Sequence, residues 1–196
     1  MRRPVAVALA AALTLATGAR ERRHTEAEKR QQQIAQLSRE LARRNSVASP
    51  SPEQLFLHAR AAALLERLRA GVPEAYVFER LAKAAEDLLE ASEDIEESRQ
   101  SERAAKPGDR EETARQLQRS YFRVQQADYF ASFAQESAPA SWVKHCRALY
   151  QQACSAWDAQ RYRKARKLAQ AASNVVGALE KLVQARASGL EPPRLP

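Results

Sequence analysis

The residue types that could carry out chemistry are few and widely spaced. Glu21 and His24 have the Glu-x-x-His spacing of a di-iron carboxylate site, which needs a second copy of the motif and further inward-facing Glu residues. Only one copy is present, and His58 and His145 stand alone. No nucleophile elbow or phosphate-binding loop occurs in the sequence. We therefore expect a non-enzymatic protein with no catalytic residue, no metal site and no cofactor.

One segment of the chain is strongly acidic. From Glu86 to Glu97 there are seven carboxylates and no base. At about 100° per residue on a helix, four of them share one stripe: Glu86, Glu90, Glu93 and Glu97. This stripe is either a solvated outer face or an acidic docking face for a basic partner or divalent cations.

A second segment is basic and contains Arg161, Arg163, Lys164, Arg166 and Lys167. Bases at the start of a helix oppose its dipole, at about 0.3–1 kcal/mol each. An acid of the same chain or an external anion should offset them. The helical wheel directs four of the five away from the core, so this run is a candidate anion-binding patch. Anionic lipid or cell-wall polymer would be its ligand; nucleic acid is not expected, because the run lacks aromatic residues for base stacking.

The two cysteines, Cys146 and Cys154, fall on one expected helix. Eight residues along a helix rise by about 12 Å, whereas the Cα atoms of a disulfide lie within about 7 Å. An intrachain disulfide is therefore not expected. Either both cysteines are small buried hydrophobic residues, or one of them pairs with another chain.

The N-terminus has the layout of a secretory signal peptide. Basic residues at Arg2 and Arg3 precede an apolar run over residues 5–16, and small residues lead to Ala19. We expect cleavage after Ala19 and an extracytoplasmic location, periplasmic or secreted, for a bacterial protein. The alternative is an uncleaved membrane anchor, although the run is shorter than the roughly 20 residues that span a bilayer.

The rest of the sequence favours helices, because Ala, Leu, Glu, Gln and Arg dominate it. The predicted fold is all-α, an antiparallel bundle of about five amphipathic helices with an extra polar helix before it. We expect the polar helix over 20–44, a linker over 45–52, the bundle domain over 53–188 and a tail over 189–196. The bundle helices are predicted at about 52–70, 73–105, 109–136, 141–159 and 161–187.

Capping signals and apolar spacing define these helices. Ser51 and Gln54 predict a capping box, as do Asp109 and Glu112. Heptad spacing predicts one buried seam in the second bundle helix, formed by Val77, Leu81, Ala84, Leu88, Ala91 and Ile95. The third bundle helix holds five aromatic residues, which we expect in the core: Tyr121, Phe122, Tyr129, Phe130 and Phe133.

The last helical hairpin resembles a single tetratricopeptide-like unit over residues 149–172. The resemblance is carried by Leu149, Ala153, Tyr162, Ala165 and Ala172. Such repeats bind protein partners, so the resemblance implies a partner-binding hairpin. The predicted function is an exported, non-enzymatic binding or structural protein of the cell envelope that acts through protein–protein contacts. The alternative is an adaptor that binds anionic lipid or cell-wall polymer through residues 161–167.

Overall fold

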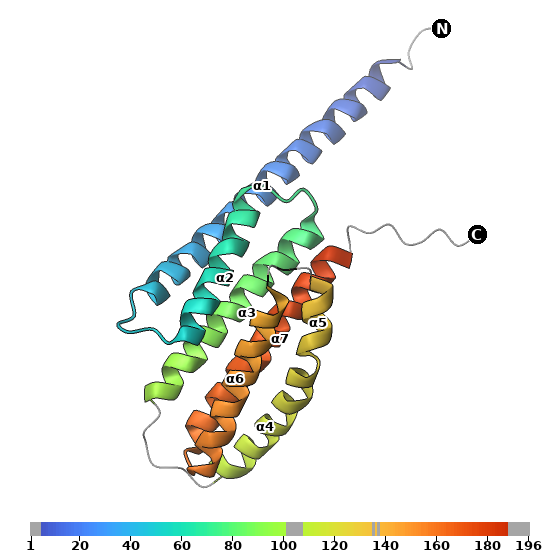
Figure 1. Ribbon diagram of the computed structural model, residues 1–196. Helices are drawn as coiled ribbons and strands as arrows, with labels where there is room; N and C mark the ends of the chain where they lie inside the picture. The colour runs from blue at the N-terminus through green and yellow to red at the C-terminus, as the bar shows by residue number, and fades with distance from the viewer. Residues whose placement is uncertain (1–4, 101–107, 135, 137, 188–196) are drawn as a thin grey trace, which may run out of the picture. The chain divides into compact units, whose positions relative to one another are not determined.

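The computed structural model describes the backbone of residues 5–100, 108–134, 136 and 138–187, and their side chains from residue 25 onward. These residues form seven α-helices and no strand, which confirms the all-α fold (Figure 1). The helices are α1 (Val5–Asn45), α2 (Pro52–Arg69), α3 (Ala75–Gln100), α4 (Asp109–Gln125), α5 (Ala127–Ala134), α6 (Pro139–Asp158) and α7 (Tyr162–Ala187). The side chains at the expected cleavage site, residues 101–107 between α3 and α4, and the tail over 189–196 lie outside this description.

The chain divides into two compact units, residues 1–36 and residues 37–196, and the boundary falls within α1. In the second unit Leu37, Leu41 and Arg44 are buried, and the Oγ atom of Ser38 accepts a hydrogen bond of 2.6 Å from Arg69. Among the described residues no helix is both long and apolar enough to cross a membrane.

Helix α2 begins as its capping signals predict. The Ser51 Oγ atom accepts a hydrogen bond of 3.2 Å from the backbone of Gln54, whose side chain in turn accepts one of 3.0 Å from the Ser51 backbone. The helix ends before Gly71, which has a φ of 96° that a side chain would oppose. The capping box is therefore confirmed.

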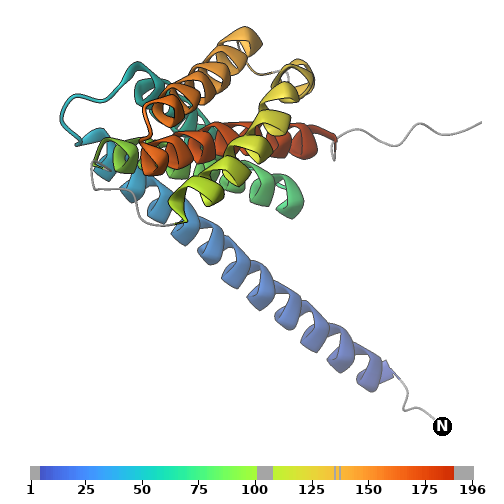
Figure 2. The same cartoon turned by 90° about the horizontal axis from the view of Figure 1, so that it is seen from below.

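Helices α3 and α7 form the centre of the bundle. Helix α7 packs against α3, α4, α5 and α6, whereas α2 packs against α3. Figure 2 shows α7 surrounded by these neighbours. Five of the six predicted seam residues of α3 are buried, Val77 being half-buried, and a second buried row contains Phe78, Ala82, Ala85 and Leu89.

Small residues allow α3 and α7 to approach closely. Ala171, Ala172 and Ala178 of α7 are fully buried. A Cβ atom at Gly177 would lie 3.0 Å from the Oδ2 atom of Asp87 on α3. Glycine at this position therefore leaves room for the Asp87 carboxylate.

The predicted helix over 109–136 is divided at Gln126, so the expectation of one helix was wrong. The Gln126 N–H donates to the carbonyls of Arg123 and Val124, a tightened last turn of α4. Helix α5 then packs against both α6 and α7. The predicted capping box at Asp109 is also wrong: Gly108 precedes the helix without a side-chain cap, and Asp109 lies inside it.

Candidate functional site

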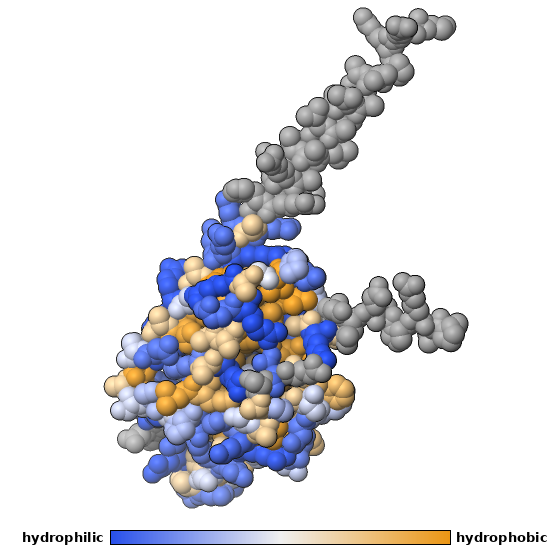
Figure 3. All heavy atoms as spheres, turned by 45° about the horizontal axis from the view of Figure 1, so that its top comes forward, coloured by the Kyte–Doolittle hydropathy of each residue, from blue (hydrophilic) through white to orange (hydrophobic). Residues whose placement is uncertain are grey.

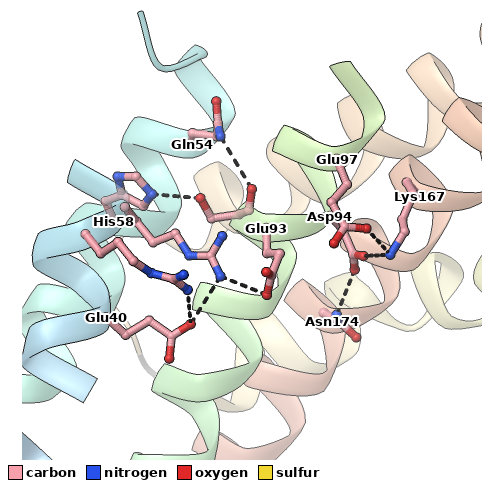
Figure 4. A network of polar contacts seen from close by, with 11 residues as sticks. Glu40, Gln54, His58, Glu93, Asp94, Glu97, Lys167 and Asn174 are labelled. Atoms are coloured by element: carbon pink, nitrogen blue, oxygen red, sulfur yellow. Dashed lines mark hydrogen bonds and ion pairs between the residues drawn. The ribbon is translucent and has the colours of Figure 1, made fainter. Parts of the chain in front are cut away.

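A cluster of charged side chains joins the last turns of α3 to the first turns of α7 (Figure 4). The Lys167 ammonium on α7 lies 3.0 Å from Oδ1 of Asp94 and 2.6 Å from Oε2 of Glu97, both on α3. Asn174, two turns further along α7, donates a 3.2 Å hydrogen bond to the other oxygen of Asp94. Asp94 is buried, with 4% of its surface exposed. This cluster therefore holds a charged acid inside a helix interface.

Burial has the largest effect on the carboxyl group of Asp94. It raises the pKa from 3.8 to about 6, although the hydrogen bond and positive charge of Lys167 act in the opposite direction. The negative charges of Glu90 and Glu97 add to the rise. Desolvation thus outweighs the ion pair at this position.

A second polar cluster lies on the other side of α3. Arg44 is buried and lies 2.8 Å from Glu93 and 3.2 Å from Glu40. His58 of α2 lies 2.7 Å from the Ser92 hydroxyl. Burial, followed by the positive charge of Arg44, lowers the pKa of His58. These contacts fasten the end of α1 and the start of α2 to α3, and His58 is one of the residues that hold them (Figure 4).

The basic run of α7 also contacts the start of α4. Arg163 forms an ion pair with Asp109, with 3.2 Å between Nε and Oδ2, and Arg166 forms one with Glu112. Together with the Lys167 contacts, three of the five bases of the candidate anion-binding patch hold acids of the same chain. Acids of α3 and α4 therefore offset most of the unfavourable interaction between these bases and the dipole of α7.

The other two bases, Arg161 and Lys164, form no ion pair within the described part of the chain. Both line a hollow of about 440 Å³ between α6 and the start of α7. The structure thus separates the predicted patch into an internal part and an accessible part.

The acidic stripe is similarly divided. Glu93 pairs with Arg44 and Glu97 with Lys167, while Glu86 lies 2.9 Å from Lys83 of its own helix. Glu90 alone of the four has no ion pair among the described residues. Most of the predicted acidic docking face is therefore engaged in contacts within the chain.

The aromatic residues of α4 and α5 lie mainly on the surface, so the prediction that they form core was wrong. Tyr121 contacts Phe122 and Tyr150, and Tyr129 contacts Phe130 and Phe133. Four of the residues are exposed by about half or more: Tyr121 (46%), Phe122 (61%), Tyr129 (61%) and Phe133 (52%). We call these four residues the exposed aromatic set.

The sequence contained a signal for this exposure. The buried positions of α4 and α5 include one series at heptad-like spacing that contains no aromatic residue: Thr113, Leu117, Ser120, Val124, Ala127, Ala131 and Ala134. The aromatic residues fall outside this series. Buried hydrogen bonds join this series to α7, since the Ser120 hydroxyl lies 2.8 Å from both the Ala169 carbonyl and the Ser173 hydroxyl.

Both cysteines are free, and α6 continues unbroken through them. Cys146 is buried, and burial raises its pKa to about 12. Cys154 is half-buried beside Tyr150, whose own pKa is raised to about 12 by burial and by Cys154. A neutral, buried Cys146 thiol is a packing residue and a poor nucleophile.

The predicted tetratricopeptide-like positions lie in the α6–α7 hairpin. Leu149, Ala153, Ala165 and Ala172 are fully buried, and Tyr162 packs its ring against Trp157 at a centroid distance of 5.0 Å. The chain reverses between the helices at Gln160, which has a φ of 60°. The partner-binding role that the resemblance implies stays a prediction.

No group of histidine, cysteine and acidic residues suitable for a metal ion occurs among the described side chains. Comparisons with protein-family models, with curated proteins and with solved structures find no match to this chain. The fold therefore defines the protein as an all-α helical bundle.

Proposed function

We propose that this chain is an exported, non-enzymatic binding protein of the cell envelope that acts through protein–protein contacts. The observation that supports this proposal is the exposed aromatic set on α4 and α5. The basic, apolar and small-residue layout of residues 1–19 supports export.

Exposed aromatic residues are unfavourable in water unless a partner covers them. The side chains of Phe122 and Phe133 have no polar group that could hydrogen-bond to water, and both are more than half exposed. Aromatic side chains are enriched at the centres of protein interfaces, where they contribute most of the binding energy. Figure 3 shows that apolar residues interrupt the hydrophilic surface on the face that it presents. The aromatic set is distinguished by ring contacts within two groups, one around Tyr121 on α4 and one around Tyr129 on α5.

The test is capture of envelope proteins by the tagged mature chain and by the double variant Phe122→Ser, Phe133→Ser. Neither residue is buried, so the variant should keep its helical circular dichroism signal. We expect a partner that the wild type retains and the double variant loses. The control is Leu55→Ser on α2, which removes an apolar residue of similar exposure, 55%, at another place.

Two results would contradict the proposal. One is a partner that the wild type, the double variant and the control retain equally. The other is a chain that cell fractionation finds entirely in the cytoplasm with its first 19 residues intact. The first would reject the binding surface and the second the export step, so the two parts are tested separately.

The alternative function, an adaptor for anionic lipid or cell-wall polymer, is supported by fewer residues than the sequence suggests. Only Arg161 and Lys164 of the basic run lack an acidic partner in the described chain. An extended polyanion would therefore meet two available charges here, not five.

A further inference from the structure

Two bases at the start of α7, Arg161 and Lys164, differ from their neighbours because neither forms an ion pair with an acid in the described part of the chain. We propose that Arg161 and Lys164, with polar residues of α6, bind the phosphate of a phosphomonoester in the hollow between the two helices. This site goes beyond the proposed protein-binding function and uses none of the exposed aromatic set.

The hollow has the size and lining of a small-molecule site. Its volume of about 440 Å³ falls in the range of about 300–1,000 Å³ that is typical of ligand pockets. Gln151, Gln152 and Ser155 of α6 line it beside the two bases, and its remaining lining residues are three alanines and Leu168. The alanines are short, so they leave the space that larger side chains would fill. A phosphate group can thus lie near the bases while an organic group covers the alanines.

The electrostatics favour a doubly charged anion. Among the described residues no carboxylate lines the hollow; Gln152, which does line it, donates a 3.3 Å hydrogen bond to Glu53. Asp158 is exposed and forms no ion pair within the described chain. A phosphomonoester carries about −1.5 to −2 charges at pH 7, which matches two cations. A carboxylate would leave one cation without a partner.

The neighbouring bases have the acidic partners that Arg161 and Lys164 lack among the described residues. Arg163, Arg166 and Lys167 each hold a carboxylate of α3 or α4. Since bases at a helix start oppose the dipole, an anion beside Arg161 and Lys164 would complete the same arrangement. Arg also offers paired N–H groups that match phosphate oxygens.

The phosphate could belong to a soluble metabolite or to a lipid headgroup, and the experiment separates these sources. Glycerol 3-phosphate is titrated into the full chain while the backbone amide shifts of α6 and α7 are followed by NMR. In parallel, flotation measures binding to phosphatidylcholine vesicles with and without phosphatidic acid. Saturable shifts at Ser155 and Lys164 support a soluble ligand, and flotation only with phosphatidic acid supports a headgroup.

The double variant Arg161→Ala, Lys164→Ala should weaken either form of binding about tenfold or more, because it removes charge-assisted hydrogen bonds. The matched control is Arg110→Ala, Arg119→Ala, which removes two exposed bases of α4 that form no ion pair in the described chain. Equal weakening by the control would show a general charge effect and overturn the proposal. So would the absence of saturable shifts together with the absence of phosphatidic-acid-dependent flotation.

Discussion

The buried carboxyl group of Asp94 gives the sharpest test of the α3–α7 interface. An ion pair with Lys167 at 3.0 Å suggests at first that Asp94 stabilises the fold. Its pKa of about 6 indicates the reverse. Between about pH 4 and pH 6 the folded chain holds a proton on Asp94 that the unfolded chain has released. The free energy of unfolding therefore falls as the pH rises through this window.

The magnitude follows from the displacement of the pKa. A rise from 3.8 to about 6 corresponds to about 3 kcal/mol. Lys167 and Glu97 retain exposed fractions of 32% and 47%, so water screens the cluster and lowers the effect to about 1–3 kcal/mol. We expect Asp94→Asn to match the wild type near pH 4, where Asp94 is neutral. Near pH 7 the variant should be more stable than the wild type by about 1–3 kcal/mol.

Urea unfolding, followed by circular dichroism at several values between about pH 4 and pH 8, measures this difference. The control is Glu79→Gln, which makes the same charge change on an exposed residue of α3 and should show no comparable slope. A variant that is less stable than the wild type at pH 7, by a margin that grows with pH, would refute the reasoning. It would show that the ion pair outweighs desolvation.

Three further predictions test the packing of the bundle. Ser51→Ala should lower the free energy of unfolding by about 1 kcal/mol, because the capping box of α2 is lost. Leu88→Ala should lower the free energy of unfolding by about 2–5 kcal/mol, whereas Phe122→Ala, at an exposed position, should change it by less than about 0.5 kcal/mol. Urea titrations of these three variants and the wild type measure the differences. In the native protein a thiol reagent should modify Cys154 first and Cys146 only on unfolding, because Cys146 is buried with a pKa of about 12, and denatured, unreduced protein should yield both thiols.

The sequence by itself determined where most helices begin and end. Ser51 and Gln54 are three residues apart, and Gly71 follows the helix they start, so each signal acts within a few residues. The heptad seam of α3 was predictable for the same reason, since Leu81, Leu88 and their neighbours share a face whatever packs against it. Local sequence also located the acidic and basic segments and kept Cys146 and Cys154 apart on one helix.

Tertiary structure alone decided which of these charges face one another. Lys167 and Asp94 are 73 residues apart in sequence, and their contact depends on the rotation and register of α7 against α3, which no local pattern fixes. The same holds for Arg163 and Asp109, which are 54 residues apart in sequence and pair across α4 and α7. Phe122 is exposed because α6 and α7 cover the face of α4 that contains Ser120 and Val124, and a helix can bury only the face that its neighbours cover.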